Sequence, residues 1–262
     1  MPELPDVQVY KQYLDATSLH KTIKNVKVED SRVLSNVTPG KLRNRLKGHK
    51  IESSRRHGKY LLAFLDAGFW LSFHFGMTGR LKYFKKMEKD PAHDRVLLSF
   101  VNGYHLAYVS QRMLGELEVV EDREEFIKKK EMGEDALSID LESFTKVVKG
   151  RRGSIKSTLM NQKLIAGIGN IYADEILFHS RIHPKTQASK LREGDFQKIF
   201  NNMTKVLEKA IRCQVDPERF PDSYLLPHRH QEGKCPRSHG NLETVKISGR
   251  TAYFCPRCQA QQ

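Results

Sequence analysis

Residues 59–84 read KYLLAFLDAGFWLSFHFGMTGRLKYF, and their pattern is the clearest indication of the fold. The stretch consists of short apolar runs, each the length of a strand, and turn-forming residues interrupt it around Gly68 and Gly76. A later stretch, RVLLSFVNGYHLAYV, has Asn102-Gly103 at its centre, and this pair favours a tight hairpin turn. Several short antiparallel strands at this spacing predict a β-sandwich or a distorted barrel within residues 51–120.

Helical patterns flank the strand region. Residues 7–19 have a loose helical period, and Thr38 is a good N-cap for a helix that has Pro39 at its first position and continues over 41–47. We interpret the mixed-charge stretch 121–131 as a solvated linker or a linker helix. Four later segments have helical patterns: 141–148, 157–166, 171–182 and 196–211.

These patterns predict a multidomain α+β chain. We expect an antiparallel β-sandwich with flanking helices over residues 1–125, a helical domain over 126–225 and a small cysteine-bearing module over 226–262. The broad apolar stripe of segment 196–211 is typical of a helix that faces a core. Cys213 follows this stripe, and we expect it to be a core residue as well.

The charge balance points to a polyanionic partner. The chain has 262 residues, and its 45 Lys and Arg against 31 Asp and Glu give a net charge of +14. Such an excess most often indicates a nucleic-acid partner, although a ribosome-like or merely basic soluble protein is the alternative. No run approaches the ~18 apolar residues of a membrane span. The N-terminus lacks the pattern of a signal peptide, so we expect a cytoplasmic, nucleoid-associated protein.

A turn with two glycines separates two of the expected helices. We expect Ser157 to cap the first helix, Gly167 to end it, and Asn170 to cap the second. Glycines at 167 and 169 let the backbone approach another group closely. The N–H groups at the start of the second helix favour an anion, for which a DNA phosphate is the obvious candidate. An ordinary helical hairpin with a glycine-rich turn is the alternative.

The C-terminal cysteines have the spacing of a metal site. Cys255 and Cys258 form a C-x2-C pair, whereas Cys235 is followed by Ser238 at the position of a second thiol and by His239 one residue later. Imidazole is a good zinc ligand and a hydroxyl is a poor one, so the sequence predicts a Cys3His site for one structural zinc ion. The alternatives are a fourth ligand from His228 or His230, or three buried thiols without metal.

Fifteen residues separate His239 from Cys255, enough for the hairpin of a zinc ribbon. This hairpin region carries Lys246, Arg250 and Arg257. A module of this size has little interior, so an arginine near its tip is displayed outward. The alternative role for such an arginine is a surface charge that improves solubility.

The first residues, MPELPDV, can supply a nucleophile. Removal of Met1 would leave Pro2 with a free secondary amine, and an α-amino group titrates near pH ~8 compared with ~10.4 for lysine. Such an amine can attack a sugar C1′ and form an iminium ion, which is covalent catalysis of the Schiff-base kind. Glu3 beside it can act as a general acid.

Four motifs together carry a resemblance that covers essentially the whole chain. MPELPDV, HGKYLL, AGIGNIYADE and GRTAYFCPRC occur in the same order as in the formamidopyrimidine-DNA glycosylase / endonuclease VIII family, which this chain resembles. The resemblance implies a DNA-repair glycosylase with AP-lyase activity, a β-sandwich, a helix-two-turn-helix domain and a zinc finger. It also implies a monomer that binds double-stranded DNA containing oxidised bases or abasic sites in the cleft between its domains.

The resemblance also implies roles for individual residues. Pro2 matches the Schiff-base nucleophile, and Glu3 matches the acid that protonates the leaving base or the opening sugar. Lys59 matches a lysine that contacts phosphate and assists β-elimination. Asn170 matches a phosphate-binding asparagine, and Arg250 matches an arginine that holds the phosphates flanking the lesion and assists δ-elimination.

Further positions match the family's DNA-contacting residues. Met77 and Arg112 match the residues that fill the gap left by the extruded base, since the damaged nucleotide must leave the stack for its chemistry. Arg95, Arg151 and Lys156 match basic positions near the DNA.

The chain departs from the family pattern at Asp6, where many members have Glu, at the Ser238-His239 knuckle, and in two further places that bear on the substrate. It has Arg112-Met113-Leu114-Gly115 where the family often has Arg-Arg-Phe-Gly. A leucine at 114 can still wedge between bases, but the preference for the opposite base stays open. The segment 214–234 is short, which favours oxidised pyrimidines or a broad substrate range. A DNA-binding protein that has lost catalysis is the main rival. An N-terminal-proline tautomerase fits neither the length, nor the basicity, nor the cysteine module.

Overall fold

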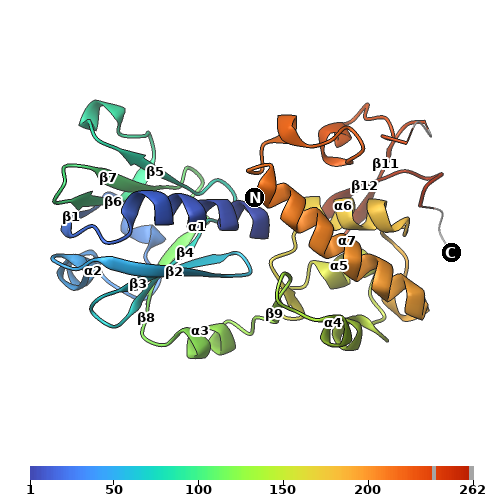
Figure 1. Ribbon diagram of the computed structural model, residues 1–262, viewed down its shortest axis with the longest axis horizontal. Helices are drawn as coiled ribbons and strands as arrows, with labels where there is room; N and C mark the ends of the chain where they lie inside the picture. The colour runs from blue at the N-terminus through green and yellow to red at the C-terminus, as the bar shows by residue number, and fades with distance from the viewer. Residues whose placement is uncertain (238–239, 260–262) are drawn as a thin grey trace. The chain divides into compact units, whose positions relative to one another are not determined.

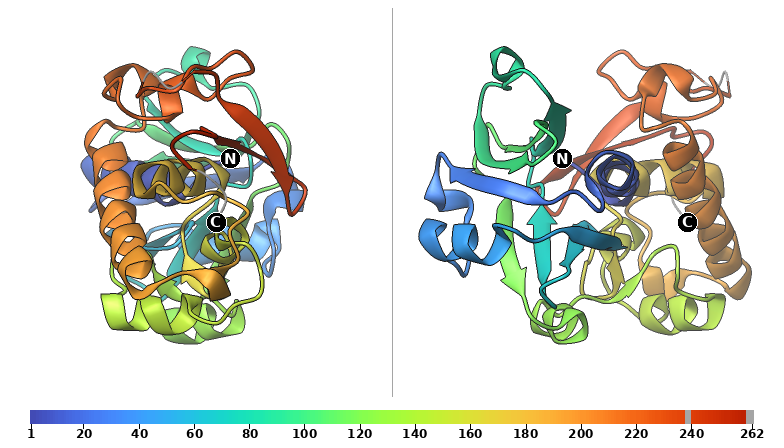
Figure 2. Two further views of the ribbon diagram at one scale, coloured as in Figure 1. Left: turned by 90° about the vertical axis from the view of Figure 1, so that its right-hand side faces the viewer. Right: turned by 60° about the vertical axis from the view of Figure 1, so that its left-hand side comes forward.

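The computed structural model describes residues 1–237 and 240–259 (Figures 1 and 2). Ser238 and His239, on which the predicted zinc ligation partly depends, lie outside the described residues. The chain forms two compact units. The first unit consists of residues 1–2 and 6–130, and the second unit consists of residues 3–5 and 131–262. The division into three domains stays a prediction.

The unit of residues 6–130 is a β-sandwich, as predicted, and Figure 1 shows its two sheets as separate layers. Both sheets are four-stranded and antiparallel. The first has the order β1 (Ile23–Val28), β6 (Asp94–Phe100), β7 (His105–Val109), β5 (Arg80–Phe84). The second has the order β2 (Ile51–His57), β3 (Tyr60–Leu65), β4 (Trp70–His74), β8 (Glu116–Val120). Leucine, valine and phenylalanine side chains from both sheets form one buried core.

The hairpin predicted at Asn102-Gly103 is present. Strands β6 and β7 pair with Ser99 opposite His105, and the N–H of Gly103 donates to the carbonyl of Phe100. Gly103 has a φ of +81°, a conformation that glycine adopts without strain.

Three helices accompany the sandwich: α1 (Leu4–Ser18), α2 (Pro39–Leu46) and α3 (Arg123–Lys129). The Thr38 hydroxyl accepts a hydrogen bond from the N–H of Lys41, so the predicted cap of α2 is confirmed. The mixed-charge stretch that we interpreted as a linker contains α3, which Asp122 caps.

The second unit is mainly helical. Its helices are α4 (Leu141–Val148), α5 (Ile155–Leu159), α6 (Asn170–Ser180) and α7 (Glu193–Arg212). Its strands are β9 (Glu134–Asp135) and β10 (Ile165–Ala166), which pair in parallel, and the antiparallel hairpin of β11 (Glu243–Ile247) and β12 (Arg250–Phe254). α7 packs on α6 and α4, and their apolar faces form the core of the unit. Cys213 is buried in this core, as predicted.

One helix is shorter than predicted. We expected a helix over 157–166, but α5 ends at Leu159, and Ser154 rather than Ser157 caps it. The chain turns where the Asn161 side chain accepts the N–H of Lys163, a local bond that competes with helix. Gly167 therefore does not end this helix; it follows the short strand β10.

Candidate active site and metal centre

A carboxylate from the start of the chain caps helix α6. The Glu3 oxygens accept hydrogen bonds from the backbone N–H groups of Gly169 (2.8 Å), Ile171 (2.8 Å) and Tyr172 (3.2 Å). Glu3 is only 1% exposed, and the positive end of a helix dipole favours its negative charge. We predicted Asn170 as the cap, which is wrong: Gly169 occupies the cap position, and Glu3 supplies the oxygen atoms.

The two glycines of the turn make room for this N-terminal segment. A Cβ atom added at Gly169 would lie 2.3 Å from the carboxyl carbon of Glu3, and one added at Gly167 would lie 2.5 Å from Cδ1 of Leu4. The N–H of Leu4 also donates to the Gly167 carbonyl at 3.0 Å. The close approach inferred from the sequence is therefore real. However, the anion at these N–H groups is Glu3 and not a DNA phosphate.

Pro2 directly precedes Glu3 and is half-buried, whereas Met1 is 45% exposed. With Met1 in place, the Pro2 nitrogen is part of a peptide bond, so a nucleophilic amine requires removal of Met1. The exposure of Met1 leaves it accessible to such processing.

Asn170 lies against the β11–β12 hairpin. Its side-chain nitrogen donates to the carbonyl of Thr251 at 3.1 Å. Arg250, the preceding residue, begins β12 and is exposed. The hairpin turn at Ser248-Gly249 has φ values of +47° and +74°, as two-residue hairpins favour. The structure therefore brings two of the predicted phosphate-binding residues to the same end of α6.

Lys156, which the resemblance places near the DNA, is not a surface residue. Its side chain is fully buried, and its ammonium lies 2.5 Å from a carboxylate oxygen of Asp174. Burial lowers the pKa of Lys156, and the Asp174 carboxylate opposes that change. An ammonium held in this way is not presented to DNA. Arg151, by contrast, is exposed, and its Nε donates to the Val147 carbonyl.

The predicted gap-filling residues lie on two adjoining loops of the sandwich. Met77 and Leu114 are 41% and 53% exposed, which is unusual for large apolar side chains. A Cβ atom added at Gly76 would lie 2.3 Å from the Leu114 carbonyl carbon, so the loops are in contact. The N–H of Arg112 also donates to the Thr78 hydroxyl at 3.2 Å. Met77, Arg112 and Leu114 thus occur together on one surface.

Lys59 and Arg95 occupy other parts of the sandwich. Lys59 lies in the turn between β2 and β3 and is half-buried. Arg95 is in β6, and its Nε donates to the Ser110 carbonyl at 2.9 Å, at the start of the loop that carries Arg112. Arg95 therefore supports this loop through its own hydrogen bond.

Three thiols form a candidate metal centre. The sulfur atoms of Cys235, Cys255 and Cys258 all lie within 4.8 Å of one another. Within residues 1–237 and 240–259, neither His228 nor His230 joins this cluster. Burial and the neighbouring thiols raise the pKa of Cys258 to about 12. A set of three sulfur ligands fits zinc.

The chain matches the formamidopyrimidine-DNA glycosylase N-terminal domain over residues 1–117 and the H2TH domain of the same enzymes over 132–220. It is 33% identical to the formamidopyrimidine-DNA glycosylase of Ureaplasma parvum, with 99% of this chain and 100% of the relative covered. It is 34% identical to that of Mycoplasma pneumoniae, with both chains fully covered. The chain belongs to the formamidopyrimidine-DNA glycosylase family.

Solved structures of this family agree with the fold. The Lactococcus lactis formamidopyrimidine-DNA glycosylase in complex with DNA containing an abasic site has a TM-score of 0.89 and 26% identity. The alignment covers 99% of this chain and 100% of the Lactococcus lactis chain. A complex of the same enzyme with DNA that contains N7-benzyl-Fapy-dG has the same TM-score, identity and coverage.

Two residues next to candidate site residues have contacts that the sequence did not predict. His74 stacks on Tyr60 with ring centroids 4.8 Å apart. Burial lowers the pKa of His74, and the positive charge of Lys59 contributes to this shift. Gln259 is fully buried, accepts the N–H of Cys255 and donates to the Ile182 carbonyl, and so anchors the cysteine knuckle. Neither a single histidine in a strand nor a glutamine near the C-terminus belongs to a sequence pattern that would predict these contacts.

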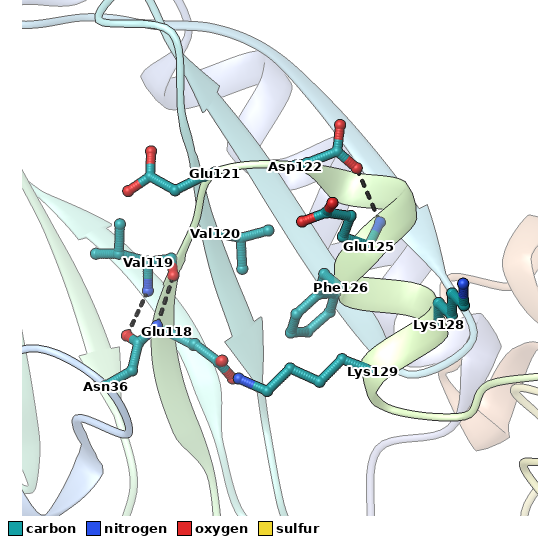
Figure 3. Close-up of a pocket in the computed structure, with 10 residues that line it drawn as sticks. All are labelled: Asn36, Glu118, Val119, Val120, Glu121, Asp122, Glu125, Phe126, Lys128 and Lys129. Carbon is teal, nitrogen blue, oxygen red and sulfur yellow. Dashed lines mark hydrogen bonds between the residues drawn. The ribbon is translucent and has the colours of Figure 1, made fainter.

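A surface pocket of about 520 Å³ between β8 and α3 is not part of the candidate site (Figure 3). The Asn36 side chain pairs with both backbone groups of Val119 there and covers this sheet edge. The pocket is lined by more carboxylates than ammonium groups, a balance that does not suit a nucleic acid. The carboxylates are Glu118, Glu121, Asp122 and Glu125, and the lysines are Lys128 and Lys129. Among the helices of the described residues, none is long and apolar enough to span a membrane.

Proposed function

We propose that this chain is a DNA glycosylase that removes oxidised bases from double-stranded DNA and cleaves the resulting abasic site. Membership of the formamidopyrimidine-DNA glycosylase family and the likeness to complexes with damaged DNA support this proposal. The observation that carries it is the buried carboxylate of Glu3, the residue after Pro2, which three N–H groups at the N-terminal end of α6 hold in place. This substrate would place the enzyme at the nucleoid, and the protein would act as a monomer.

In the proposed reaction, the Pro2 amine of the processed chain attacks C1′ of the damaged nucleotide. The bond from C1′ to the base breaks, and the base leaves with that electron pair and takes up a proton. The Pro2 nitrogen loses its own proton, the C1′–O4′ bond then breaks, and the ring oxygen is protonated; Glu3 supplies the proton for the base or for this oxygen. The Pro2 nitrogen and C1′ then share an iminium bond. Loss of a C2′ proton expels the 3′ phosphate, and a second elimination expels the 5′ phosphate.

Other residues would bind and distort the DNA. Asn170, Arg250 and Lys59 would contact phosphates without reading sequence. Met77 and Leu114 would fill the gap left when the damaged nucleotide leaves the stack, with Arg112 beside them. The cysteine cluster, with His239 as the proposed fourth ligand, would hold one structural zinc ion. This ion would stabilise the hairpin and take no part in the chemistry.

The test is base excision and covalent trapping. The processed protein should cut duplexes that carry single oxidised bases, and a panel of lesions will identify its preference. Sodium borohydride should link it to DNA with an abasic site, whereas Pro2→Gly or a form that retains Met1 should be trapped far less. Equal trapping by the form with Met1 would refute the role of Pro2. Binding of abasic DNA without excision or trapping would instead identify a binding protein that has lost catalysis.

A further inference from the structure

The backbone groups on the outer edge of strand β12 form hydrogen bonds with side chains instead of with another strand. In this hairpin, Ile247–Arg250 and Val245–Ala252 are the hydrogen-bonded pairs, so the backbone groups of Thr251 and Tyr253 point away from β11. Unpaired groups at a strand edge need other partners. The Thr251 carbonyl accepts from Asn170 (3.1 Å) and from Arg229 (3.3 Å), and the Tyr253 N–H donates to Asp174 (3.1 Å).

The spacing of the helix matches the spacing of the strand. Asn170 and Asp174 are four residues apart on α6, which corresponds to a rise of about 6 Å. Thr251 and Tyr253 are two residues apart on β12, a rise of about 6.6 Å. One side of α6 therefore meets two successive outward groups of the strand, and this match fixes the register of the hairpin on the helix. Figures 1 and 2 show β12 beside α6.

Asp174 is the centre of this contact. It is buried, and besides the Tyr253 N–H it accepts from the Lys156 ammonium at 2.5 Å and from Nε of Arg229 at 3.0 Å. The Arg229 guanidinium also lies over the Tyr253 ring at 4.8 Å. Burying three charged groups is costly, and no step of the proposed reaction uses them.

We propose that Asp174 and Arg229 are positioning residues that hold the β11–β12 hairpin in register on α6. Arg250 directly precedes Thr251, whose carbonyl Asn170 and Arg229 both bind. Fixing Thr251 therefore places Arg250 beside Asn170, and the two residues form one phosphate-binding surface. This inference rests on the proposed function, because it assigns that surface to DNA.

The first test is Asp174→Asn, which keeps the shape of the side chain and removes one negative charge. General electrostatics predicts tighter DNA binding for this variant. Mispositioning of Arg250 predicts the opposite, namely about tenfold weaker binding to a duplex with a tetrahydrofuran abasic analogue and a salt slope lower by about one. Glu193→Gln makes the same charge change at an exposed side chain and should not weaken binding.

The second test is Arg229→Met. This change leaves the buried Lys156–Asp174 ion pair intact and so disturbs the interior less than Asp174→Asn does. Arg250→Ala should weaken DNA binding about tenfold in the wild type but by less than about threefold in Arg229→Met. The reason is that Arg250, when it is not held in position, contributes less to DNA binding. Arg219→Met removes an exposed guanidinium elsewhere and should leave the effect of Arg250→Ala at its full size.

The third measurement does not depend on DNA. The Tyr253 amide should exchange its hydrogen faster in Asp174→Asn and in Arg229→Met, while both variants retain metal and helix content. Tighter DNA binding by Asp174→Asn together with unchanged Tyr253 exchange would overturn the inference, and so would an equal effect of Arg250→Ala in both backgrounds. If the wild type binds no damaged DNA, the proposed function is wrong, and so is the assignment of Asn170 and Arg250 to a phosphate-binding surface. The hydrogen-exchange data would still show whether Asp174 and Arg229 hold the hairpin on α6.

Discussion

At the scale of single residues, the N-terminal end of α6 shows what a sequence can and cannot reveal. The pair of glycines at 167 and 169 indicated a close approach of the backbone, and the structure has one at both positions. The approaching group was not predictable from local pattern, because Glu3 and Gly169 are 166 positions apart in the chain. The local sequence made Asn170 the natural cap. A distant carboxylate with three N–H donors took that role instead.

Gly169→Ala should displace Glu3. The new Cβ would lie 2.3 Å from the Glu3 carboxyl carbon, and neither the helix start nor a carboxylate held by three bonds can shift without losing those bonds. We expect a loss of about 2 kcal/mol or more in the free energy of unfolding. Since a displacement of about 1 Å can cost a factor of about 100 in rate, we also expect single-turnover base excision to fall by that order.

Gly194→Ala is the matched control for this change. Gly194 lies in the first turn of α7, and an added Cβ atom would meet nothing within 4 Å. Alanine is the better helix former, so stability should be unchanged or rise by up to about 1 kcal/mol, with normal excision. Wild-type excision by Gly169→Ala would show that the cap of α6 by Glu3 does not matter for the reaction.

At the scale of helices and strands, elements with a clear period were predictable and those ended by local side-chain bonds were not. The strands of the sandwich and helix α4 follow the sequence pattern closely. Helix α5 is shorter than its sequence pattern predicts, because the Gln162 side chain forms hydrogen bonds with the backbone on both sides of the turn that follows the helix. It donates to the carbonyls of Met160 and Ile168 and accepts the N–H of Gly167. No periodic signal in the sequence marks such a clamp.

The β11–β12 hairpin gives the prediction at this scale. Arg250→Ala and Asn170→Ala should each weaken binding to abasic-site DNA by a similar factor in every sequence context, because phosphate contacts carry no base information. The slope of log affinity against log salt should fall by about one for Arg250→Ala, since one fewer counterion is released. Titrations by fluorescence anisotropy at several salt concentrations measure both quantities.

Lys198→Ala removes one positive charge from the exposed face of α7 and serves as the control for net charge. Its salt slope should stay close to that of the wild type. A change of base preference in Arg250→Ala with an unchanged salt slope would contradict a phosphate contact for this residue.

At the scale of the whole molecule, the start of the chain contributes to both compact units. Leu4 is part of the core of the unit that contains residues 131–262, whereas Val7 is part of the core of the sandwich. Both residues belong to α1. The fold class was predictable, since strands, helices and cysteines occur in separate blocks of the sequence. The membership of residues 3–5 in the second unit was not, because it depends on contacts with residues far along the chain.

Metal removal should act on one of these units only. The apolar cluster beneath the cysteine module is small: Phe178, Leu225, Cys235, Leu242 and Cys255. With the proposed zinc ion bound, a module with so little apolar burial would take much of its folding energy from the metal. A chelator should therefore release one zinc ion per chain, increase hydrogen exchange in the β11–β12 hairpin and abolish DNA binding. Exchange in the strands of the sandwich should stay unchanged, since that unit has its own core.

Variants of the ligand set decide how this metal is held. Cys255→Ser should lose zinc, because it removes one of the three clustered thiols. If His239 is the fourth ligand, His239→Ala should also lose zinc and bind DNA weakly, whereas Ser238→Ala should do neither, since a hydroxyl coordinates zinc poorly. Elemental analysis of the three purified variants measures the metal. Should His239→Ala keep one zinc per chain, the Cys3His assignment is wrong. His228 and His230 would then have to leave their present positions to replace it, because neither joins the thiol cluster among the described residues.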